Sequence, residues 1–286
     1  MPGNMQALAG NSLSLCQRQN YNNIFNYGKR ALPLHDMEHQ PTFSIVTVAW
    51  NAARVIGPTL ESVQQQSCRD FEYLVVDGAS TDATLQLVTD AGIAGTRIVS
   101  EPDHGIYDAM NKAIGLARGR YLIWLNAGDA LATPRSLERM AALAAAGPDV
   151  IYGQTQIVDA SRRVVGMRHL TAPDRLGWRD FARGMLVCHQ AFVARREIVP
   201  RYDLRYRYSA DYDWCIKVLK RSQRNAYLGP EPVVSFLEEG TTTAHHKASL
   251  KERYHIMCHY YGTVPTIVRH LSFLPRYLKQ KLLHHA

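Results

Sequence analysis

The chain has 286 residues, of which 46% are hydrophobic and 20% charged, a composition typical of a globular protein with one large core. Its five cysteines are scattered and form no C-x-x-C pair, which excludes a zinc knuckle and a disulfide framework and favours a reducing, cytoplasmic location. No apolar run approaches the roughly 18 residues that span a bilayer, and no signal-peptide pattern opens the chain, so we expect neither a membrane span nor secretion.

The net charge of +8 is unevenly distributed. Residues 41–130 carry 6 Lys and Arg against 10 Asp and Glu, whereas residues 131–286 carry 24 against 13. The acidic and the basic half are therefore expected to do different work. Basic motifs interleaved with aromatic residues are absent from the sequence, which predicts no nucleic-acid partner.

Residues 1–40 have no sustained hydrophobic period and are expected to form a loosely ordered leader. From Phe43 onward, apolar strands alternate with amphipathic helices. Expected strands cover residues 43–50, 71–80, 96–102 and 120–129, and expected helices cover residues 53–67, 81–92 and 106–119. This spacing requires crossover connections and predicts an α/β fold, an open, mostly parallel twisted sheet flanked by helices. Residues 41–130 are thus expected to form a nucleotide-binding half.

Polar residues follow each of the four expected strands, at the edge where ligands of such sheets bind. Three of these strand ends carry an acid, namely Asp77, Asp103 and Asp129, and two carry an amide, Asn51 and Asn126. Asp-Gly pairs also occur in ordinary turns, but four polar ends in register favour a ligand site. A phosphorylated ligand would need a cation at this acidic edge. The sequence lacks both G-x-G-x-x-G after a strand and G-x-x-x-x-G-K-[ST], which disfavours dinucleotide and P-loop chemistry.

The helix expected from residue 106 begins directly after Gly105, so its N–H groups point toward that edge and could hold phosphate. Asp103 and His104 would then lie at the rim, although a plain loop with a capping acid is the alternative. The expected apolar face of this helix contains Ile106, Met110, Ala113, Ile114 and Ala117, with Tyr107, Asp108, Asn111 and Lys112 off it.

Residues 131–245 are expected to form the second half of the same domain. Residues 149–170 read as two strands joined by a turn, and residues 185–198 are apolar except near His189. A buried histidine is usually a hydrogen-bonded core residue, which is the alternative for His189. A helix is expected after Ser209, with Asp211 and Asp213 in its first turn, where acids also stabilise the helix dipole.

Residues 246–286 are expected to form basic amphipathic helices. Apolar residues recur on one face of the last segment, residues 266–286, and basic residues surround them; the apolar set is Ile267, Leu271, Leu274, Leu278 and Leu282. Such a tail can contact an anionic membrane peripherally, or it can pack on the preceding domain or on a second subunit. The sequence leaves these alternatives open.

Two segments, "FSIVTVAWNAARVIGPTLESVQQQSCRDFEYLVVDGASTDAT" and "SEPDHGIYDAMNKAIGLARGRYLIWLNAGD", carry a family resemblance. They resemble the start of family 2 inverting glycosyltransferases of the GT-A fold, most closely the bacterial exopolysaccharide and colanic-acid type. The resemblance implies a UDP- or GDP-sugar donor, a Mg²⁺ or Mn²⁺ ion, and a glycan or polyisoprenoid-linked acceptor at the inner face of the plasma membrane, in cell-surface polysaccharide biosynthesis. A non-catalytic nucleotide-sugar-binding or scaffold protein is the alternative function.

The resemblance implies that residues 131–245 supply the acceptor site and the catalytic base, and together with the strand ends it assigns roles to individual residues. Asp211 is expected to be the catalytic base, with Asp213 in reserve, and Asp129 and His245 to bind the metal. Donor binding is assigned to Val48, Trp50, Asn51, Asp77, Asp82, Asp103, Asn126 and His189. Three of these residues have simpler alternatives: core packing for Trp50, a helix-dipole role for Asp82 and a solvated loop for His245. The segment from Asn126 to Asp129 departs from the family pattern, because it has one carboxylate where many relatives have two or three.

Overall fold

The computed structural model describes residues 40–238 and 246–271. Its first half is built on strands β1 (Phe43–Ala49), β2 (Phe71–Asp77), β3 (Thr96–Ser100) and β4 (Tyr121–Trp124). All four run parallel in the order β3-β2-β1-β4, and every residue of β1 and β4 is buried. A strand covered on both faces must be apolar throughout, which explains the continuous hydrophobic runs. The four strands expected in this half are confirmed.

The second half continues the same sheet with mixed pairing. Strand β8 (Phe192–Arg195) runs antiparallel to β4, and β6 (Val150–Val158) runs antiparallel to β8. Strand β9 (Asn225–Leu237) then pairs parallel with β6 and antiparallel with the short β5 (Ala130–Leu131), while β7 (Val164–Met167) pairs with β6. The resulting nine-stranded sheet joins both halves of the sequence into one core.

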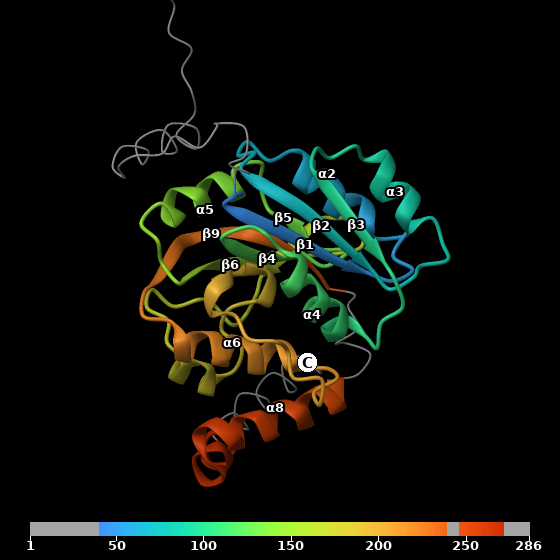
Figure 1. The fold of residues 1–286 in the computed structure, drawn as a ribbon. Helices are drawn as coiled ribbons and strands as arrows, with labels where there is room; N and C mark the ends of the chain where they lie inside the picture. The colour runs from blue at the N-terminus through green and yellow to red at the C-terminus, as the bar shows by residue number, and fades with distance from the viewer. Residues whose placement is uncertain (1–39, 239–245, 272–286) are drawn as a thin grey trace, which may run out of the picture. The chain divides into compact units, whose positions relative to one another are not determined.

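Helices cover both faces of this sheet (Figure 1). Helices α2 (Ile56–Gln64) and α3 (Thr84–Asp90) lie on one face, and α4 (Ile106–Leu116) lies on the other. Right-handed crossovers dictate this placement, because the chain moves outward from β1 to β3 and then returns across the sheet to β4. The described residues also form helices α5 (Ser136–Ala144), α6 (Ala210–Arg221) and α8 (His246–Tyr261) and a helical segment over 263–271. 3₁₀ turns lie at Trp178–Arg183, His189–Ala191 and Arg196–Ile198.

An aromatic cluster fills the core between β4 and α6. The indole rings of Trp124 and Trp214 meet edge to face at 6.2 Å, and Tyr202 stacks on Trp214 at 5.2 Å. His189 stacks on Trp124 at 5.8 Å. Large aromatic side chains contribute most of the area that such a core removes from water, so this cluster fixes α6 against the end of β4.

Three features differ from the expectations. Strand β9 is 13 residues long, although its sequence contains Gly229, Pro230 and Pro232, and α5 and β5 were not anticipated. Helix α4 buries Met110 and Ala113, and its C-cap residue Ala117, as expected, but its first turn differs, because Ile106 is 43% exposed and Tyr107 is buried. This difference has a physical cause, since Tyr107 stacks on Tyr202 at 5.5 Å. Of the described residues, no helix is long and apolar enough to cross a membrane.

Candidate functional site

Hydrogen bonds join the loops that follow β1 and β2 at the carboxyl edge of the sheet. Asn51, at φ 47°, donates its backbone N–H to Ser80 Oγ at 2.8 Å, and its side-chain Oδ1 accepts from the Thr81 N–H at 2.9 Å. Asp82 Oδ2 accepts from the Ala53 N–H at 3.0 Å. Asp77 is fully buried and accepts hydrogen bonds from Ser80 and from Ser100. These carboxylates therefore fix the shape of the loops.

Asp82 also stabilises the start of α3, because its Oδ1 accepts a hydrogen bond from the N–H of Thr84 at 3.0 Å. Hydrogen bonds from the Thr84 side chain and from backbone N–H groups hold the pKa of Asp82 below its ordinary value. The side chain of Val48 lies in the core of β1, opposite Val76. The structure thus places Val48, Asp77 and Asp82 beneath or within the loops that would carry a ligand.

Trp50, Gly78 and Asp103 form an open ledge above these loops, which we call the Trp50 shelf. The Trp50 side chain is 70% exposed and is not part of the core. A Cβ atom placed on Gly78 would lie 2.5 Å from Asp103 Oδ2 and 3.4 Å from Trp50 Cδ1, so both side chains close over this glycine. Asp103 is held by the N–H of Gly105, which donates to its Oδ1 at 2.8 Å just before α4 begins. An exposed indole can stack on a flat group, and the neighbouring Asp103 carboxylate can accept hydrogen bonds from that group.

The end of β4 brings Asn126 and Asp129 to the same edge. Asn126 Oδ1 is buried and has no hydrogen-bond partner in the described part of the chain, so it can accept a hydrogen bond from a ligand. Asp129 is only 5% exposed; its Oδ2 accepts from Gln190 Nε2 at 2.6 Å and its Oδ1 accepts from the Leu237 N–H at 3.0 Å. Burial raises the pKa of Asp129 to about 7, against these two bonds and the charge of Arg162.

The described residues do not supply a metal ligand set at Asp129. Both oxygens of this carboxylate already accept hydrogen bonds, and a hard divalent cation requires several oxygen ligands. Within residues 40–238 and 246–271, no group of three or more His, Cys, Asp and Glu side chains could hold an ion. His245 lies outside the described residues. The roles of Asp129 and His245 as metal ligands therefore stay predictions.

Asp211 lies in the first turn of α6, partly exposed. Its Oδ1 accepts two hydrogen bonds, from the Tyr107 hydroxyl at 3.2 Å and from the Tyr212 N–H at 2.9 Å. Its Oδ2 makes no hydrogen bond to any of the described residues. The carboxylate is thus oriented through one oxygen while the other oxygen can receive a proton.

Comparison with known proteins agrees with this geometry. The model of the family described as "Glycosyl transferase family 2" matches residues 44–202, which is more than half of the chain. The chain belongs to glycosyl transferase family 2. It is 38% identical over 185 residues to a PGL/p-HBAD biosynthesis glycosyltransferase of Mycobacterium bovis, covering 62% of this chain and 69% of that protein. It is 28% identical over 193 residues to the amylovoran biosynthesis glycosyltransferase AmsB of Erwinia amylovora, covering 63% and 64%.

Among solved structures, residues 1–349 of S. aureus TarS in complex with UDP-GlcNAc have a similar fold. The TM-score is 0.63 at 17% sequence identity, and the match covers 81% of this chain and 73% of that chain. The GT-A fold class expected from the sequence is confirmed, and so is the resemblance to family 2.

In this family 2 chain, His189 lies in the aromatic core. Its Nε2 shares a 2.7 Å hydrogen bond with the Tyr202 hydroxyl, and the residue is 4% exposed. Burial lowers the pKa of His189 to about 4, with the charge of Asp211 acting in the opposite direction. The imidazole is therefore neutral near pH 7, and donor contact by His189 stays a prediction.

The neutral state of His189 predicts how stability depends on pH. In the unfolded chain His189 takes up a proton below pH about 6.5, whereas the folded residue does so only near pH about 4. The contribution of neutral His189 to the free energy of unfolding is therefore complete above pH about 6.5 and is lost as the pH falls toward about 4. Urea unfolding across this window should record a loss of about 3 kcal/mol from this group. His189→Gln lacks the titrating ring and should lose correspondingly less; an identical pH profile would contradict a buried neutral imidazole.

Tyr107 is a site residue to which sequence reasoning gave no role, and Gln190, which follows His189, is a second contact of the site. Gln190 bridges Asp129 and Cys188, and Tyr107 reaches Asp211 from α4 across 104 residues of sequence. Burial, together with the negative charge of Asp211, raises the pKa of Tyr107 well above its ordinary value, so its hydroxyl stays protonated and donates. The only signal in the sequence was a tyrosine directly beside the start of the helix.

Tyr107→Phe removes one of the two donors that orient Asp211. The carboxylate is then oriented by the Tyr212 N–H alone, so turnover should fall by about tenfold while donor affinity stays within a few-fold of the wild type. Tyr121→Phe is the matched control, because the Tyr121 hydroxyl donates to the Pro148 carbonyl at the opposite edge of the sheet. Unchanged turnover in Tyr107→Phe, or an equal loss in both variants, would contradict a positioning role for Tyr107.

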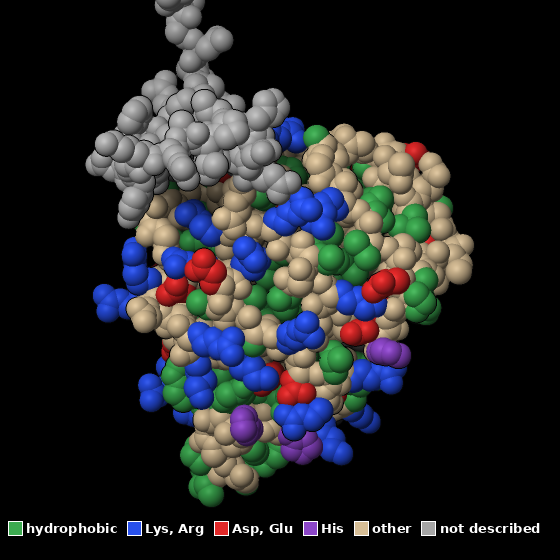
Figure 2. Space-filling model, in the orientation of Figure 1, with side chains coloured by type: hydrophobic (Ala, Val, Ile, Leu, Met, Phe, Trp, Pro, Cys, Tyr) green, Lys and Arg blue, Asp and Glu red, His purple; other side chains and the backbone are tan. Residues whose placement is uncertain are grey.

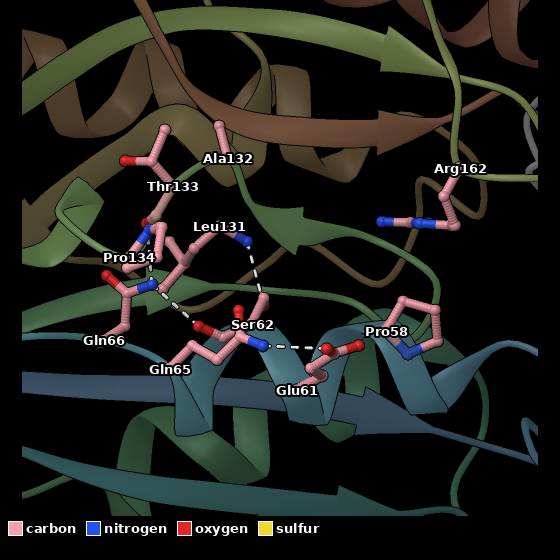
Figure 3. A pocket seen from close by; sticks show the side chains of 10 residues that line it. All are labelled: Pro58, Glu61, Ser62, Gln65, Gln66, Leu131, Ala132, Thr133, Pro134 and Arg162. Atoms are coloured by element: carbon pink, nitrogen blue, oxygen red, sulfur yellow. Dashed lines mark hydrogen bonds between the residues drawn. The ribbon is translucent and has the colours of Figure 1, made fainter.

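A separate polar pocket lies between α2 and the segment that follows β5 (Figure 3). Pro58, Glu61 and Ser62 line it from α2, and Leu131 and Thr133 line it from the other side. None of the residues expected at the site lines this pocket, so the candidate site is the strand edge described above.

Proposed function

We propose that this chain transfers a sugar, with inversion, from a UDP- or GDP-sugar to a hydroxyl of a glycan or polyisoprenoid-linked acceptor in cell-surface polysaccharide biosynthesis. The observation that carries the proposal is Asp211, oriented through Oδ1 by Tyr107 and Tyr212 with Oδ2 open. The names of the mycobacterial and Erwinia relatives support glycan biosynthesis, and the UDP-GlcNAc bound by TarS supports a nucleotide-sugar donor.

The donor is proposed to bind along the strand edge, from the Trp50 shelf to the end of β4. The exposed Trp50 indole can stack on the nucleotide base while Asp103 accepts a hydrogen bond from it. The buried, unpartnered Oδ1 of Asn126 suits a ribose hydroxyl, which donates a hydrogen bond. The first turn of α4, which starts after Gly105, faces this edge with its positive dipole end and suits the diphosphate.

The reaction proposed is a single displacement at the anomeric carbon. Asp211 Oδ2 takes the proton of the acceptor hydroxyl, whose oxygen forms a bond to the anomeric carbon from the side opposite the diphosphate. The bond from that carbon to the diphosphate oxygen breaks, and its electron pair leaves with the nucleoside diphosphate. No covalent enzyme intermediate forms, so one carboxylate is sufficient.

A Mg²⁺ or Mn²⁺ ion is proposed on the family resemblance alone, and no step above depends on it. Isothermal titration of UDP and GDP with Mn²⁺, and again in EDTA, tests it directly. Binding that weakens in EDTA would support the ion, and equal affinity would remove it from the proposal.

The proposed activity is tested by incubating the purified chain with a panel of UDP- and GDP-sugars and following the release of nucleoside diphosphate. We expect slow hydrolysis of one donor, with water replacing the acceptor and the released sugar showing the inverted anomer by NMR. Binding of a donor without any release would instead support the non-catalytic alternative. Retained configuration would contradict the single displacement.

Gly78→Ala should weaken donor binding by about tenfold, because the new Cβ would displace the Asp103 carboxylate from the Trp50 shelf. Stability should change little, since the contacted atom is the end of a side chain that can rotate. Gly57→Ala in α2 is the control, because a Cβ there meets nothing within 4 Å. Titration of UDP and GDP against both variants measures the difference, and unchanged affinity in Gly78→Ala would place the base elsewhere.

A further inference from the structure

The helical segment 263–271 exposes an apolar row that has no partner within residues 40–238 and 246–271. Val264 is 71% exposed, Ile267 43%, Val268 60% and Leu271 62%, and their spacing of i, i+3, i+4 and i+7 places them on one face of the helix. Scattered exposed hydrophobic residues are ordinary, but four in one row mark an interaction surface.

This segment is fixed to the catalytic body by its other side. Thr266 is fully buried and donates its hydroxyl to the Gly262 carbonyl at 2.7 Å, and His270 meets the ring of Tyr254 edge to face at 5.5 Å. Just before the segment, Tyr261 stacks on Trp178 at 5.7 Å and donates its hydroxyl to the Trp178 carbonyl. The apolar row is thus held outward by packing of the opposite face.

Basic and aromatic side chains surround the same region. Lys220 lies 5.3 Å from the rings of both Trp178 and Tyr260, and Arg269 lies 5.8 Å from the ring of Tyr261. Residues 246–271 contain Lys247, Lys251, Arg253 and Arg269 against a single acid, Glu252. Figure 2 shows Lys and Arg side chains spread over the face seen in that view, with far fewer acids. Tryptophan and tyrosine beside cations and an apolar row are the groups that settle at a membrane–water interface.

We propose that Val264, Ile267, Val268 and Leu271 form a docking surface for an anionic lipid bilayer. Charge complementarity selects this occupant, because a second copy of the chain would bring two strongly basic surfaces together. Apolar side chains enter the acyl boundary while the surrounding Lys and Arg attract anionic headgroups. Of the alternatives that the sequence left open for this segment, the proposal selects membrane contact.

The docking surface is rigidly linked to the proposed base. Glu252 on α8 accepts from the N–H groups of Arg207 and Tyr208 at 2.9 and 2.8 Å, and Ser249 contacts Ser209 at 2.9 Å, directly before α6 begins. A bilayer held at segment 263–271 would therefore present a lipid-linked acceptor to the body that carries Asp211. Only this last step rests on the proposed function.

Cosedimentation of the full chain with vesicles tests the surface. We expect binding to phosphatidylcholine vesicles that contain about one-third phosphatidylglycerol and much weaker binding to phosphatidylcholine alone. The double variant Val264→Ser, Val268→Ser should reduce partitioning by about tenfold. The matched control is Val164→Ser, Val165→Ser in β7, which removes two valines that are 58% and 54% exposed and should leave partitioning unchanged.

Failure of the wild-type chain to bind anionic vesicles, or an equal loss in both double variants, would overturn the proposal. A dimer in sedimentation equilibrium that only the Val264, Val268 variant dissociates, with vesicle binding intact, would assign the face to a second copy and also overturn it. Donor hydrolysis is measured in the absence of vesicles, so its loss or retention reports on the proposed function separately.

Discussion

Replacing Asp211 by asparagine is expected to lower the turnover of the nucleotide-sugar by about 10²- to 10⁴-fold, the usual contribution of a positioned proton acceptor. The amide has almost the same shape and can still accept from Tyr107 and from the Tyr212 N–H, so α6 should remain in place. It cannot take up the acceptor proton at neutral pH. Donor affinity, measured by titration, should stay within a few-fold of the wild type, so that rate and binding separate.

Asp213→Asn is the internal control, two residues away on the same helix. Asp213 is 2% exposed, accepts from the Tyr260 hydroxyl at 2.8 Å and pairs with Lys217 at 2.6 Å. The Lys217 side chain is partly exposed, so removing the charge of Asp213 from this pair should cost about 1–3 kcal/mol of unfolding free energy. Turnover per folded molecule should stay near that of the wild type. The sequence offered only a helix-dipole role as the alternative for Asp213, because it did not reveal that Tyr260 of α8 contacts this carboxylate.

The opposite pattern in the two variants would transfer the role of base to Asp213. A pair in which neither variant lost more than about tenfold in rate would leave the single displacement without its proton acceptor, because a general base is worth more than that. Turnover is compared per folded molecule in both variants, because circular dichroism and thermal unfolding report the folded fraction independently of activity.

The first half of the fold could be predicted because its strands are buried on both faces and its helices have one apolar face. Continuous apolar runs such as Phe43–Ala49 have few alternatives once helices flank them. Strand β9 has no such signal: it is 13 residues long, contains glycine and proline, and is stabilised by pairing with β6 and β5. Long-range pairing of this kind overrides local preference, and no sequence period records it.

For the candidate site, the sequence predicted which residues lie at the edge of the sheet but not which hydrogen bonds they make. Parallel strands bring their ends together, so Trp50, Asp103 and Asn126 could be placed at one edge from the sequence, and the structure places them there. Which oxygens stay open could not be predicted. Asp129 and Asp77 accept internal hydrogen bonds, whereas one oxygen of Asp211 accepts none from the described residues. Each outcome depends in part on neighbours that are 23 to 108 residues away in sequence, such as Ser100 for Asp77 and Leu237 for Asp129.

The opposite edge of the sheet should govern stability instead of chemistry, and Gly119 tests this. The chain enters β4 so close to β1 that a Cβ on Gly119 would lie 2.4 Å from Ser44 N and 2.5 Å from the Phe43 carbonyl carbon. The Gly119 N–H also donates to Ser44 Oγ at 2.8 Å, and Glu72 accepts from the Arg118 N–H beside it. Backbone atoms cannot rotate away as a side chain can, so the two strands would have to separate.

Gly119→Ala is therefore expected to destabilise the fold by about 3 kcal/mol or more, a size reached only by core clashes, cavities and broken buried networks. Gly115→Ala, four residues earlier in α4, is the control: a Cβ there meets nothing within 4 Å, and alanine in a helix should add about 0.5–1 kcal/mol of stability. Urea unfolding of both variants gives the two values. Equal stability of the two variants would mean that β1 and the entry to β4 can separate without a cost in free energy. The expected contrast, together with unchanged donor affinity of the folded Gly119→Ala protein, would assign stability to this edge of the sheet and chemistry to the other.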